Sequence, residues 1–218
     1  MHPRKPVIAN YKIFVFVGFI CTALITSLFV YRTTHHDNMT LVNDENSVVM
    51  PVGRDLKSVD LVTTDGDAFT ERNLFTHWTL MFFGFTHCNN VCPVTLEMMN
   101  KAYPTLHAAM PTLQVVFVSL DPVRDTKVKL SQYTQSFNTN FVGVSGKIES
   151  IRKLQSQLGI YSAIDSNTQD SDNYQLQHTS SIMLINPQGK WVAMFKYGLT
   201  PKAFEHSVIQ AVKAVTKA

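Results

Sequence analysis

Residues 80–93 read LMFFGFTHCNNVCP, and this stretch decides the fold. The apolar run from Trp78 to Phe85 is typical of a short buried strand, because aromatic-rich segments bounded by turn residues pack into the middle of a sheet. Pro93 suits the first turn of a helix, where its missing N–H would have no partner in any case. Apolar residues at helical spacing then predict a helix over 94–107. The stretch is therefore predicted to pass from a strand into a helix.

Two cysteines, Cys88 and Cys92, lie at this junction with three residues between them. The unpaired N–H groups and the positive end of the helix dipole favour an anion there, so we expect the Cys88 thiol to have a lowered pKa and to be reactive. Residues four apart in a helical turn share a face, at a separation that suits a disulfide or joint binding of one metal ion. From the residues alone, the pair can be a disulfide, a redox-active dithiol or a metal clamp.

The rest of the chain alternates between predicted strands and helices, which indicates an α/β layer structure. A cysteine pair that opens a helix after a central strand favours, within that class, a thioredoxin-like central sheet flanked by helices. Asp125 is expected to cap a helix over 126–137, and Gly159 to end a helix over 147–158. The last predicted helix is 201–215, and the other predicted strands are 59–64, 113–120, 141–144, 181–185 and 190–195.

Ile13 to Tyr31 is a run of nineteen residues without a charge, which is long enough to cross a bilayer as a helix. The basic residues in front of the run favour a cytoplasmic amino terminus. A cleaved signal peptide is the alternative, but the run is long for one and no small-residue cleavage site follows it. A lipidated Cys21 fits less well, because the bulky Ile20 stands where such sites require a small residue. We therefore predict one N-terminal transmembrane helix.

These observations divide the chain into four predicted parts: a cytoplasmic N-terminus (1–12), a transmembrane helix (13–31), a polar linker (32–54) and one globular domain (55–218). Residues 1–32 carry no acidic side chain, and beyond them basic and acidic residues nearly balance. The net charge of +3 thus comes from the segment around the predicted span. It gives no support for nucleic-acid binding.

Three motifs follow one another along the domain: FFGFTHCNNVCP at 82–93, LDPVRDT at 120–126 and YQLQHTSSIMLINPQGKW at 174–191. Together they are similar to the Sco/SenC family of membrane-anchored copper proteins that help to assemble cytochrome c oxidase. The resemblance covers residues from about 55 to 210. It implies a thioredoxin-like fold with insertions, and one copper ion bound by Cys88, Cys92 and His178.

The same resemblance implies a copper metallochaperone that assembles the CuA site of cytochrome c oxidase, with the oxidase subunit that carries this site as its partner. A periplasmic copper carrier or a thiol reductant is a further expected partner. The short N-terminal segment lacks the length and the Ser and Arg content of an organelle transit sequence. We therefore expect a single-pass protein of a bacterial inner membrane, with its domain in the periplasm.

The implied ligand set has a definite chemical preference. Two thiolates and an imidazole suit Cu(I) and can also hold Cu(II), and zinc is the competing metal. The chain departs from the family pattern at Asn89 and Asn90, where Pro–Asp is common, and at Gln177, where an acidic residue often precedes the histidine. Both departures remove negative charge near the metal, so we hypothesise that the protein favours Cu(I), or relies more on its thiols than on stored Cu(II).

The same cysteines suggest a second class of function, a thiol–disulfide oxidoreductase that reduces the CuA-site cysteines, and a redox sensor is a third. No proline lies between Pro122 and Pro187, although thioredoxin-like enzymes usually place a cis-proline opposite their cysteines. Whether the chain is an enzyme is left open. Supporting or structural roles are expected for His87, Met98, Met99, Asp121, Asp125 and Tyr174, and Asp172 could supply an oxygen ligand.

Overall fold

The computed structural model describes residues 14–15, 17–27, 45–165 and 174–217. Contacts divide the chain into two units, residues 1–38 and 39–218. In the first unit, residues 17–27 are helical. Over the described residues, no helix combines the length and the apolar character that crossing a membrane requires. The expected span, 13–31, reaches past the described residues at both ends and stays a prediction.

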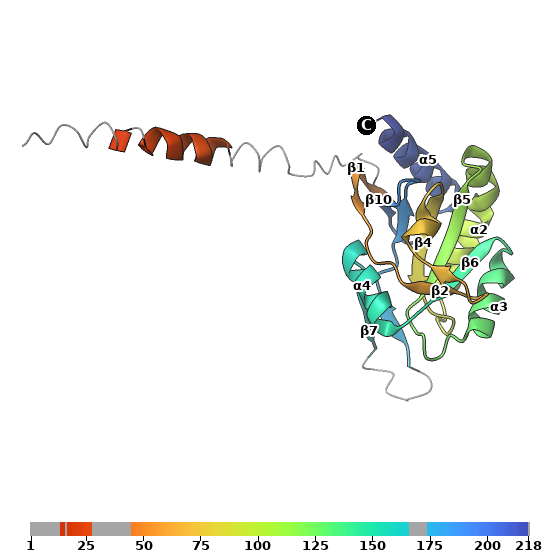
Figure 1. The fold of residues 1–218 in the computed structure, drawn as a ribbon. Coiled ribbons are helices and arrows are strands. Elements are labelled where there is room, and N and C mark those ends of the chain that lie inside the picture. Colours follow the sequence, from red (N-terminus) through yellow and green to blue (C-terminus); the bar gives the residue numbers. More distant parts are fainter. Residues whose placement is uncertain (1–13, 16, 28–44, 166–173, 218) are drawn as a thin grey trace, which may run out of the picture. The chain divides into compact units, whose positions relative to one another are not determined.

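The second unit is a mixed sheet with helices packed against it (Figure 1). Its elements in chain order are β1 (Ser47–Asp55), β2 (Leu61–Thr63), β3 (Ala68–Phe69), the 3-10 helix η1 (Glu71–Leu74), β4 (Trp78–Gly84), α2 (Val91–Ala109), β5 (Leu113–Ser119), α3 (Lys127–Phe137), β6 (Phe141–Ser145), α4 (Ile148–Leu158), β7 (Ser162–Ile164), β8 (Leu176–His178), β9 (Ile182–Ile185), β10 (Lys190–Phe195) and α5 (Pro201–Lys217).

The strand order of the main sheet is β1-β10-β9-β4-β5-β6-β2-β3. β4, β5 and β6 are parallel neighbours, with Leu80 opposite Val115 and Val115 opposite Phe141, and β9 and β10 complete the centre as antiparallel strands. The β4–α2–β5 crossover and the β9–β10 hairpin followed by α5 form the thioredoxin-like arrangement predicted from the sequence. β4 lies in the middle of the main sheet, so the cysteine loop that follows its carboxyl end lies at the centre of that end of the sheet.

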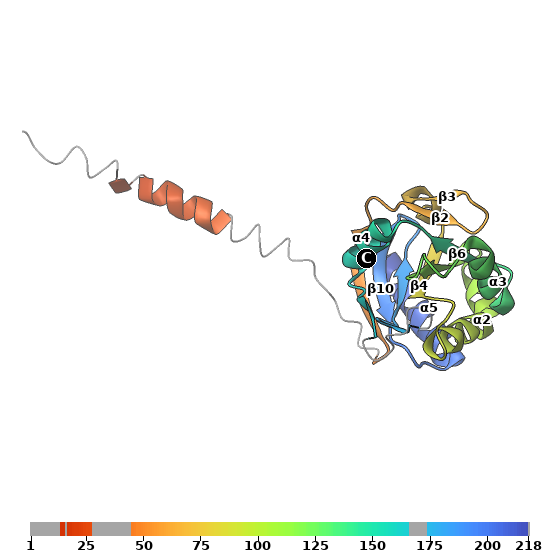
Figure 2. The ribbon, with the colours of Figure 1, turned by 90° about the horizontal axis from the view of Figure 1, so that it is seen from below.

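Side chains that alternate along β4 build two cores, one on each face of the sheet. Leu80 and Phe82 belong to the core under α2, α3 and α5, whereas Met81 and Phe83 belong to the core under α4. Figure 2 shows the strands running between α4 on one side and α2, α3 and α5 on the other. Because β4 is covered on both faces, the strand is apolar except for Thr79 rather than alternating, which is why its sequence stands out.

The predicted linker, 32–54, is wrong at its C-terminal end. Part of this range belongs to β1, which pairs antiparallel with β10, with Ser47 opposite Phe195. The strand contains Pro51 and Gly53, two residues that argue against a strand from sequence alone. An edge position tolerates proline, and Gly53 has a φ of 69° at an irregularity in the register. The folded domain therefore starts before Asp55.

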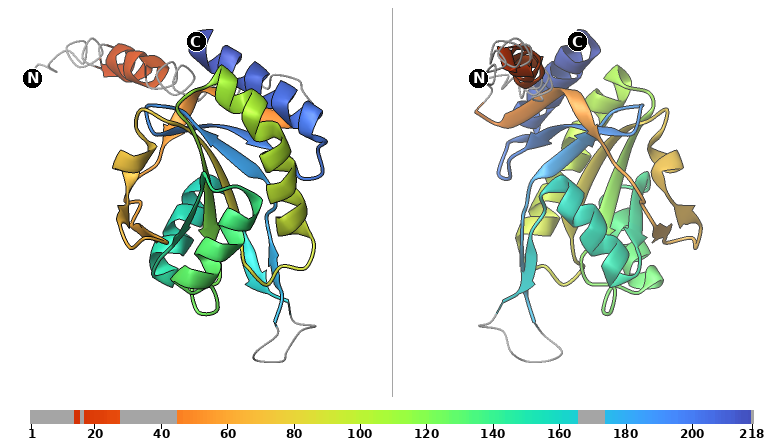
Figure 3. Two further views of the ribbon diagram at one scale, coloured as in Figure 1. Left: turned by 90° about the vertical axis from the view of Figure 1, so that its right-hand side faces the viewer. Right: turned by 60° about the vertical axis from the view of Figure 1, so that its left-hand side comes forward.

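Two further differences concern the segments that carry the site. The N-cap of α3 is Thr126, whose hydroxyl accepts a hydrogen bond from the N–H of Lys129 at 3.4 Å, and not Asp125 as predicted. The short strands β7 and β8 were not predicted; they pair with each other as a separate two-stranded sheet, with Ser162 opposite His178. Figure 3 shows this pair, in cyan, beside the end of the sheet at which α2 begins.

Candidate metal centre

Three side chains from separate segments converge at the carboxyl end of β4. Cys88 lies in the turn after β4, Cys92 in the first turn of α2, and His178 at the end of β8. The two sulfurs and a ring nitrogen all lie within 4.8 Å of one another, and Cys92 Sγ is 3.6 Å from His178 Nε2. The structure therefore brings together all three residues that the family resemblance implied as metal ligands.

The position of Cys92 depends on a glycine in the strand beneath it. Cys92 is fully buried. A β-carbon on Gly84 would lie 2.8 Å from Cys92 Sγ and 2.8 Å from a ring carbon of Phe117. Atoms do not approach that closely without displacement, so the absence of a side chain at Gly84 leaves the volume that the sulfur fills. Sequence analysis missed this role, although Gly84 lies within the GFTHC motif.

The sulfur of Cys88 is placed to carry negative charge. The neighbouring thiol of Cys92 donates a hydrogen bond to it, which is the largest cause of a Cys88 pKa of about 4, and burial works against this shift. Hydrogen bonds from backbone N–H groups contribute in the same direction; the N–H of Cys92 is 3.3 Å from Cys88 Sγ. The side chain of the N-cap residue, Asn90, makes no capping bond, so this sulfur takes the place of a side-chain cap on α2.

Cys92 has the opposite character. Its hydrogen bond to Cys88, its burial and the charge on Cys88 all raise the pKa of the Cys92 thiol. The two cysteines do not form a disulfide. The pair therefore shares one proton: Cys88 is the thiolate and Cys92 is the thiol that donates to it. The lowered pKa of Cys88 was predicted from the helix terminus, but the partner thiol proves to be the larger cause.

His178 is held in one orientation by its backbone neighbour and two aromatic rings. Its Nδ1 is 3.0 Å from the carbonyl oxygen of Thr179, so Nδ1 carries the proton and donates it to that oxygen. The rings of Phe82 and Phe85 contact the imidazole at centroid distances of 6.2 and 6.1 Å. In the neutral ring this leaves Nε2 without a proton and directed at Cys92, which is the state in which an imidazole binds a metal.

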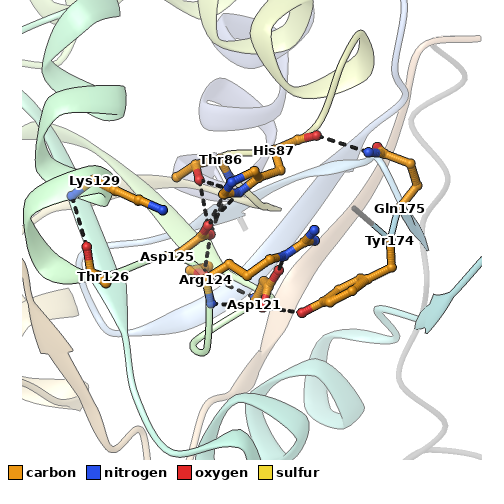
Figure 4. A network of polar contacts seen from close by, with 10 residues as sticks. Thr86, His87, Asp121, Arg124, Asp125, Thr126, Lys129, Tyr174 and Gln175 are labelled. Carbon is orange, nitrogen blue, oxygen red and sulfur yellow. Dashed lines mark hydrogen bonds and ion pairs between the residues drawn. The ribbon is translucent and has the colours of Figure 1, made fainter. Parts of the chain in front are cut away.

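A buried carboxylate supports the cysteine loop from behind (Figure 4). Asp125 accepts hydrogen bonds from the hydroxyl of Thr86 at 2.6 Å, from the N–H of Thr86 at 3.1 Å, and from the hydroxyl of Ser119 at 2.6 Å. Its side chain is inaccessible to solvent. His87 lies on the outer side of this group, with Nδ1 3.8 Å from Asp125 Oδ1. Asp125 therefore fixes the residues that precede Cys88, a role that the predicted helix cap did not include.

A second polar group lies next to it and contacts the chain just before β8. Tyr174 donates its hydroxyl hydrogen to Asp121 Oδ1 at 2.7 Å, and Arg124 Nε donates to the other oxygen of the same carboxylate. The guanidinium carbon of Arg124 lies 3.4 Å from the centre of the Tyr174 ring. Gln175 Nε2 also donates to the carbonyl oxygen of His87 at 3.3 Å. These contacts join the histidine segment to the cysteine loop (Figure 4).

The remaining sequence candidates have clear positions. Met98 and Met99 are buried core residues of α2, as expected from their spacing. His87 is not part of the three-residue cluster, which agrees with a supporting role. Asn89, Asn90 and Gln177 are exposed around the site. Asp172, considered as an oxygen ligand, falls outside the described residues.

The donor set suits a soft or borderline metal ion. Thiolates select Cu(I) and zinc, and an imidazole binds copper or zinc as well. Three protein ligands leave a coordination position for a further ligand. Among the described residues, this is the one group of three or more metal-binding side chains whose ligand atoms converge.

Comparisons with known proteins agree with this geometry. The family model described as SCO1/SenC matches residues 53–213. A SCO2-like protein of Rickettsia felis is 30% identical over 143 residues, which cover 66% of this chain and 70% of the relative. Among solved structures, ScoI of Bradyrhizobium japonicum with copper bound is 30% identical with a TM-score of 0.62, and the match covers 70% of this chain and 96% of that one. ScoI of Arabidopsis thaliana with copper bound is 25% identical with a TM-score of 0.64, covering 72% and 99%.

Proposed function

Because the chain belongs to the SCO1/SenC family, we propose that its domain binds one copper ion through Cys88, Cys92 and His178 and delivers it to the CuA site of cytochrome c oxidase. The observation that carries the proposal is the convergence of the three ligand atoms within 4.8 Å. Two sulfurs and one imidazole nitrogen suit copper in either oxidation state. The copper-bound structures of the two ScoI relatives support copper over zinc.

The two cysteines take different parts in binding. Cys88 is already a thiolate and partly exposed, so it offers the first ligand to an incoming ion. Cys92 is a thiol and must lose its proton to become a ligand, so binding releases a proton to solvent. His178 adds its Nε2 without losing a proton, because Nδ1 holds the proton against Thr179. Three protein ligands leave room for an acceptor thiolate, and copper can then pass on by ligand exchange.

The location of the domain forms part of the proposal. The uncharged run 13–31 anchors the chain in the inner membrane of a bacterium, with residues 1–12 in the cytoplasm and the domain in the periplasm. The distribution of basic residues before this run supports the orientation. A periplasmic copper carrier supplies copper to the domain, or a thiol reductant supplies it with electrons. The oxidase subunit with the CuA site receives copper from the domain.

One observation favours a second candidate function. The cysteines are free, and Cys88 is a partly exposed thiolate four residues from a thiol that can resolve a mixed disulfide. This is the arrangement of a thiol–disulfide oxidoreductase. Such a protein would reduce the cysteines of the CuA site before copper enters, and a redox sensor would use the same pair.

The experiment that separates these functions is oxidase activity in cells that carry His178→Ala. A copper donor loses a ligand and the cells should lose most of their oxidase activity, with partial recovery when copper is added to the medium. A thiol reductase keeps both cysteines and should retain its activity. His206→Ala is the matched control, because His206 is exposed on α5 and belongs to no cluster of ligands. Full oxidase activity with His178→Ala would reject copper delivery through this site.

A further inference from the structure

The third ligand lies on an element that is weakly tied to the sheet. His178 ends β8, and in the part of the chain that the structure describes β8 pairs with β7 in a separate two-stranded sheet. Two short strands by themselves are marginally stable in water. The distance between His178 and the cysteines therefore depends on the contacts that this segment makes with the rest of the domain.

Three residues form such a contact, and we call them the clasp: Asp121, Arg124 and Tyr174. Tyr174, four residues before His178, donates its hydroxyl to Asp121, and its ring is covered by the guanidinium of Arg124. Arg124 in turn donates to Asp121. The side chains of Asp121 and Arg124 are 2% and 11% exposed, so these charged contacts are shielded from water and are stronger than surface contacts.

The clasp is attached to the same turn that holds the cysteine loop. Asp125 accepts from Thr86, two residues before Cys88, and from the hydroxyl of Ser119. The Ser119 oxygen also accepts from the backbone N–H of Asp121, at 3.1 Å. The turn between β5 and α3 therefore contacts the segment before the cysteines at one end and the segment before the histidine at the other (Figure 4).

We infer that the clasp is a positioning device which holds His178 within bonding distance of a metal on the two cysteines, and thereby determines how well the site holds Cu(II). This inference rests on the proposed function. No clasp side chain belongs to the group of ligands. Cu(I) is satisfied by soft thiolates, whereas Cu(II) depends on nitrogen and oxygen ligands. Opening the clasp therefore weakens Cu(II) binding much more than Cu(I) binding.

The test uses the purified full chain with Tyr174→Phe, which keeps the ring beneath Arg124 and removes the hydroxyl that reaches Asp121. Dissociation constants for Cu(I) and Cu(II) are measured by competition with chelators of known affinity, and nitrogen coupling to Cu(II) is read by electron paramagnetic resonance. Loss of a partner that hydrogen-bonds to a metal ligand typically weakens metal binding about 10- to 100-fold, and Tyr174 acts one step further away, so we take the lower end of this range. We expect this loss for Cu(II) with weaker nitrogen coupling, and a change below about threefold for Cu(I).

Tyr161→Phe is the matched control, because Tyr161 lies next to β7 and its side chain is 65% exposed. It should leave both dissociation constants unchanged. Arg124→Lys keeps the charge but loses the planar stacking on the ring of Tyr174. It should weaken Cu(II) binding in the same way as Tyr174→Phe. Equal weakening of Cu(I) and Cu(II) binding, or no change in either affinity, would overturn the positioning role inferred for the clasp.

A double-mutant cycle shows whether the clasp acts through the histidine. In protein that already carries His178→Ala, Tyr174→Phe should cause no further loss of Cu(II) affinity. The same loss in both backgrounds would mean a general structural effect and would overturn the inference. If His178→Ala by itself leaves Cu(II) binding and nitrogen coupling intact, the three-ligand site is wrong, and the proposed function fails together with the clasp.

Discussion

A β-carbon on Gly84 would lie 2.8 Å from the sulfur of Cys92, so this sulfur occupies the volume that a side chain at Gly84 would need. The glycine at the end of β4 is therefore required for the buried side chain of Cys92 to adopt this position. This contact gives the first of five predictions about the domain.

Gly84→Ala should lower both stability and copper affinity. The new methyl group would lie 2.8 Å from Cys92 Sγ, so the sulfur must move. Overpacking of this kind costs about 1–3 kcal/mol of unfolding free energy. Denaturant unfolding and chelator competition measure the two effects.

Gly143→Ala is the control for this prediction. A β-carbon there would lie 3.0 Å from atoms of Leu130 and Thr64, away from the cysteines. It should lower the unfolding free energy by a similar amount and leave the copper affinity as in the wild-type protein. Unchanged copper binding in Gly84→Ala would contradict the role assigned to this glycine.

The second prediction concerns the pH dependence of alkylation of the reduced, metal-free protein. The Cys88 pKa is lowered to about 4, so the sulfur stays a thiolate at neutral pH and its reaction with iodoacetamide should slow only as the pH falls through about 4. The hydrogen bond to Cys88, burial and the charge of Cys88 raise the pKa of Cys92, which should react slowly at neutral pH. Mass spectrometry of the labelled peptides reports each cysteine separately.

Cys92→Ala tests the cause of this behaviour. The thiol of Cys92 is the largest source of the lowered Cys88 pKa, so its removal should move the midpoint of Cys88 alkylation upwards. A wild-type midpoint near the ordinary thiol value of about 8.5 would show that the helix start and the partner thiol do not stabilise the thiolate.

A third prediction concerns the buried carboxylate. Asp125→Ala removes the acceptor for the hydroxyls of Thr86 and Ser119 and for one backbone N–H. Each buried donor left without a partner costs about 1–3 kcal/mol, and we expect a total loss of about 3 kcal/mol in unfolding free energy. Chemical denaturation followed by circular dichroism provides the measurement.

Asp60→Ala serves as its control. Asp60 accepts one exposed hydrogen bond, from Ser150 at 3.1 Å, and surface contacts of this kind contribute about 0.5 kcal/mol or less. If both substitutions shift the unfolding midpoint equally, Asp125 does not hold the cysteine loop in the way described.

The fourth prediction is the tautomer of His178 in the metal-free protein. Nδ1 donates to the carbonyl oxygen of Thr179, so neutral His178 should carry its proton on Nδ1 and leave Nε2 free. Long-range proton–nitrogen correlation spectra distinguish the two ring nitrogens. A proton on Nε2 would mean that the ring is turned away from the ligand orientation.

The fifth prediction follows from β1. A fragment that begins at Asp55 loses the edge strand together with the buried side chains of Val49 and Met50. Burial of two such side chains stabilises a domain by about 4 kcal/mol, so this fragment should be far less stable than one that begins at Glu45. Equal unfolding free energies of the two fragments would show that β1 is dispensable.

The parts of the fold that the sequence predicts are those with a strong local pattern. β4 is apolar except for Thr79 because both faces are covered, and Gly159 ends α4 with a left-handed backbone, as expected. β1 was missed because Pro51 and Gly53 interrupt it, and a tertiary contact with β10 overrides that local signal. β7 and β8 are three residues long and are too short to show a periodicity.

The residues of the site likewise fall into those with a local sequence signal and those that depend on tertiary contacts. The cysteine pair was visible from its spacing, but no local pattern connects Cys92 with a histidine 86 residues further along the chain. His178 was identified from the family motifs, and the structure confirms that it lies beside the sulfurs. The roles of Gly84 and Asp125 depend on contacts between segments, and sequence periodicity carries no information about such contacts.

The two sulfurs are unequally buried, so reagents reach the centre from one side. Cys92 is enclosed by the core, whereas Cys88 is partly open to solvent. A peroxide, an alkylating reagent or the thiolate of another protein must therefore react with Cys88 first and with Cys92 last. Any exchange reaction at this centre therefore begins at Cys88, and the reagent that reaches this sulfur determines its outcome.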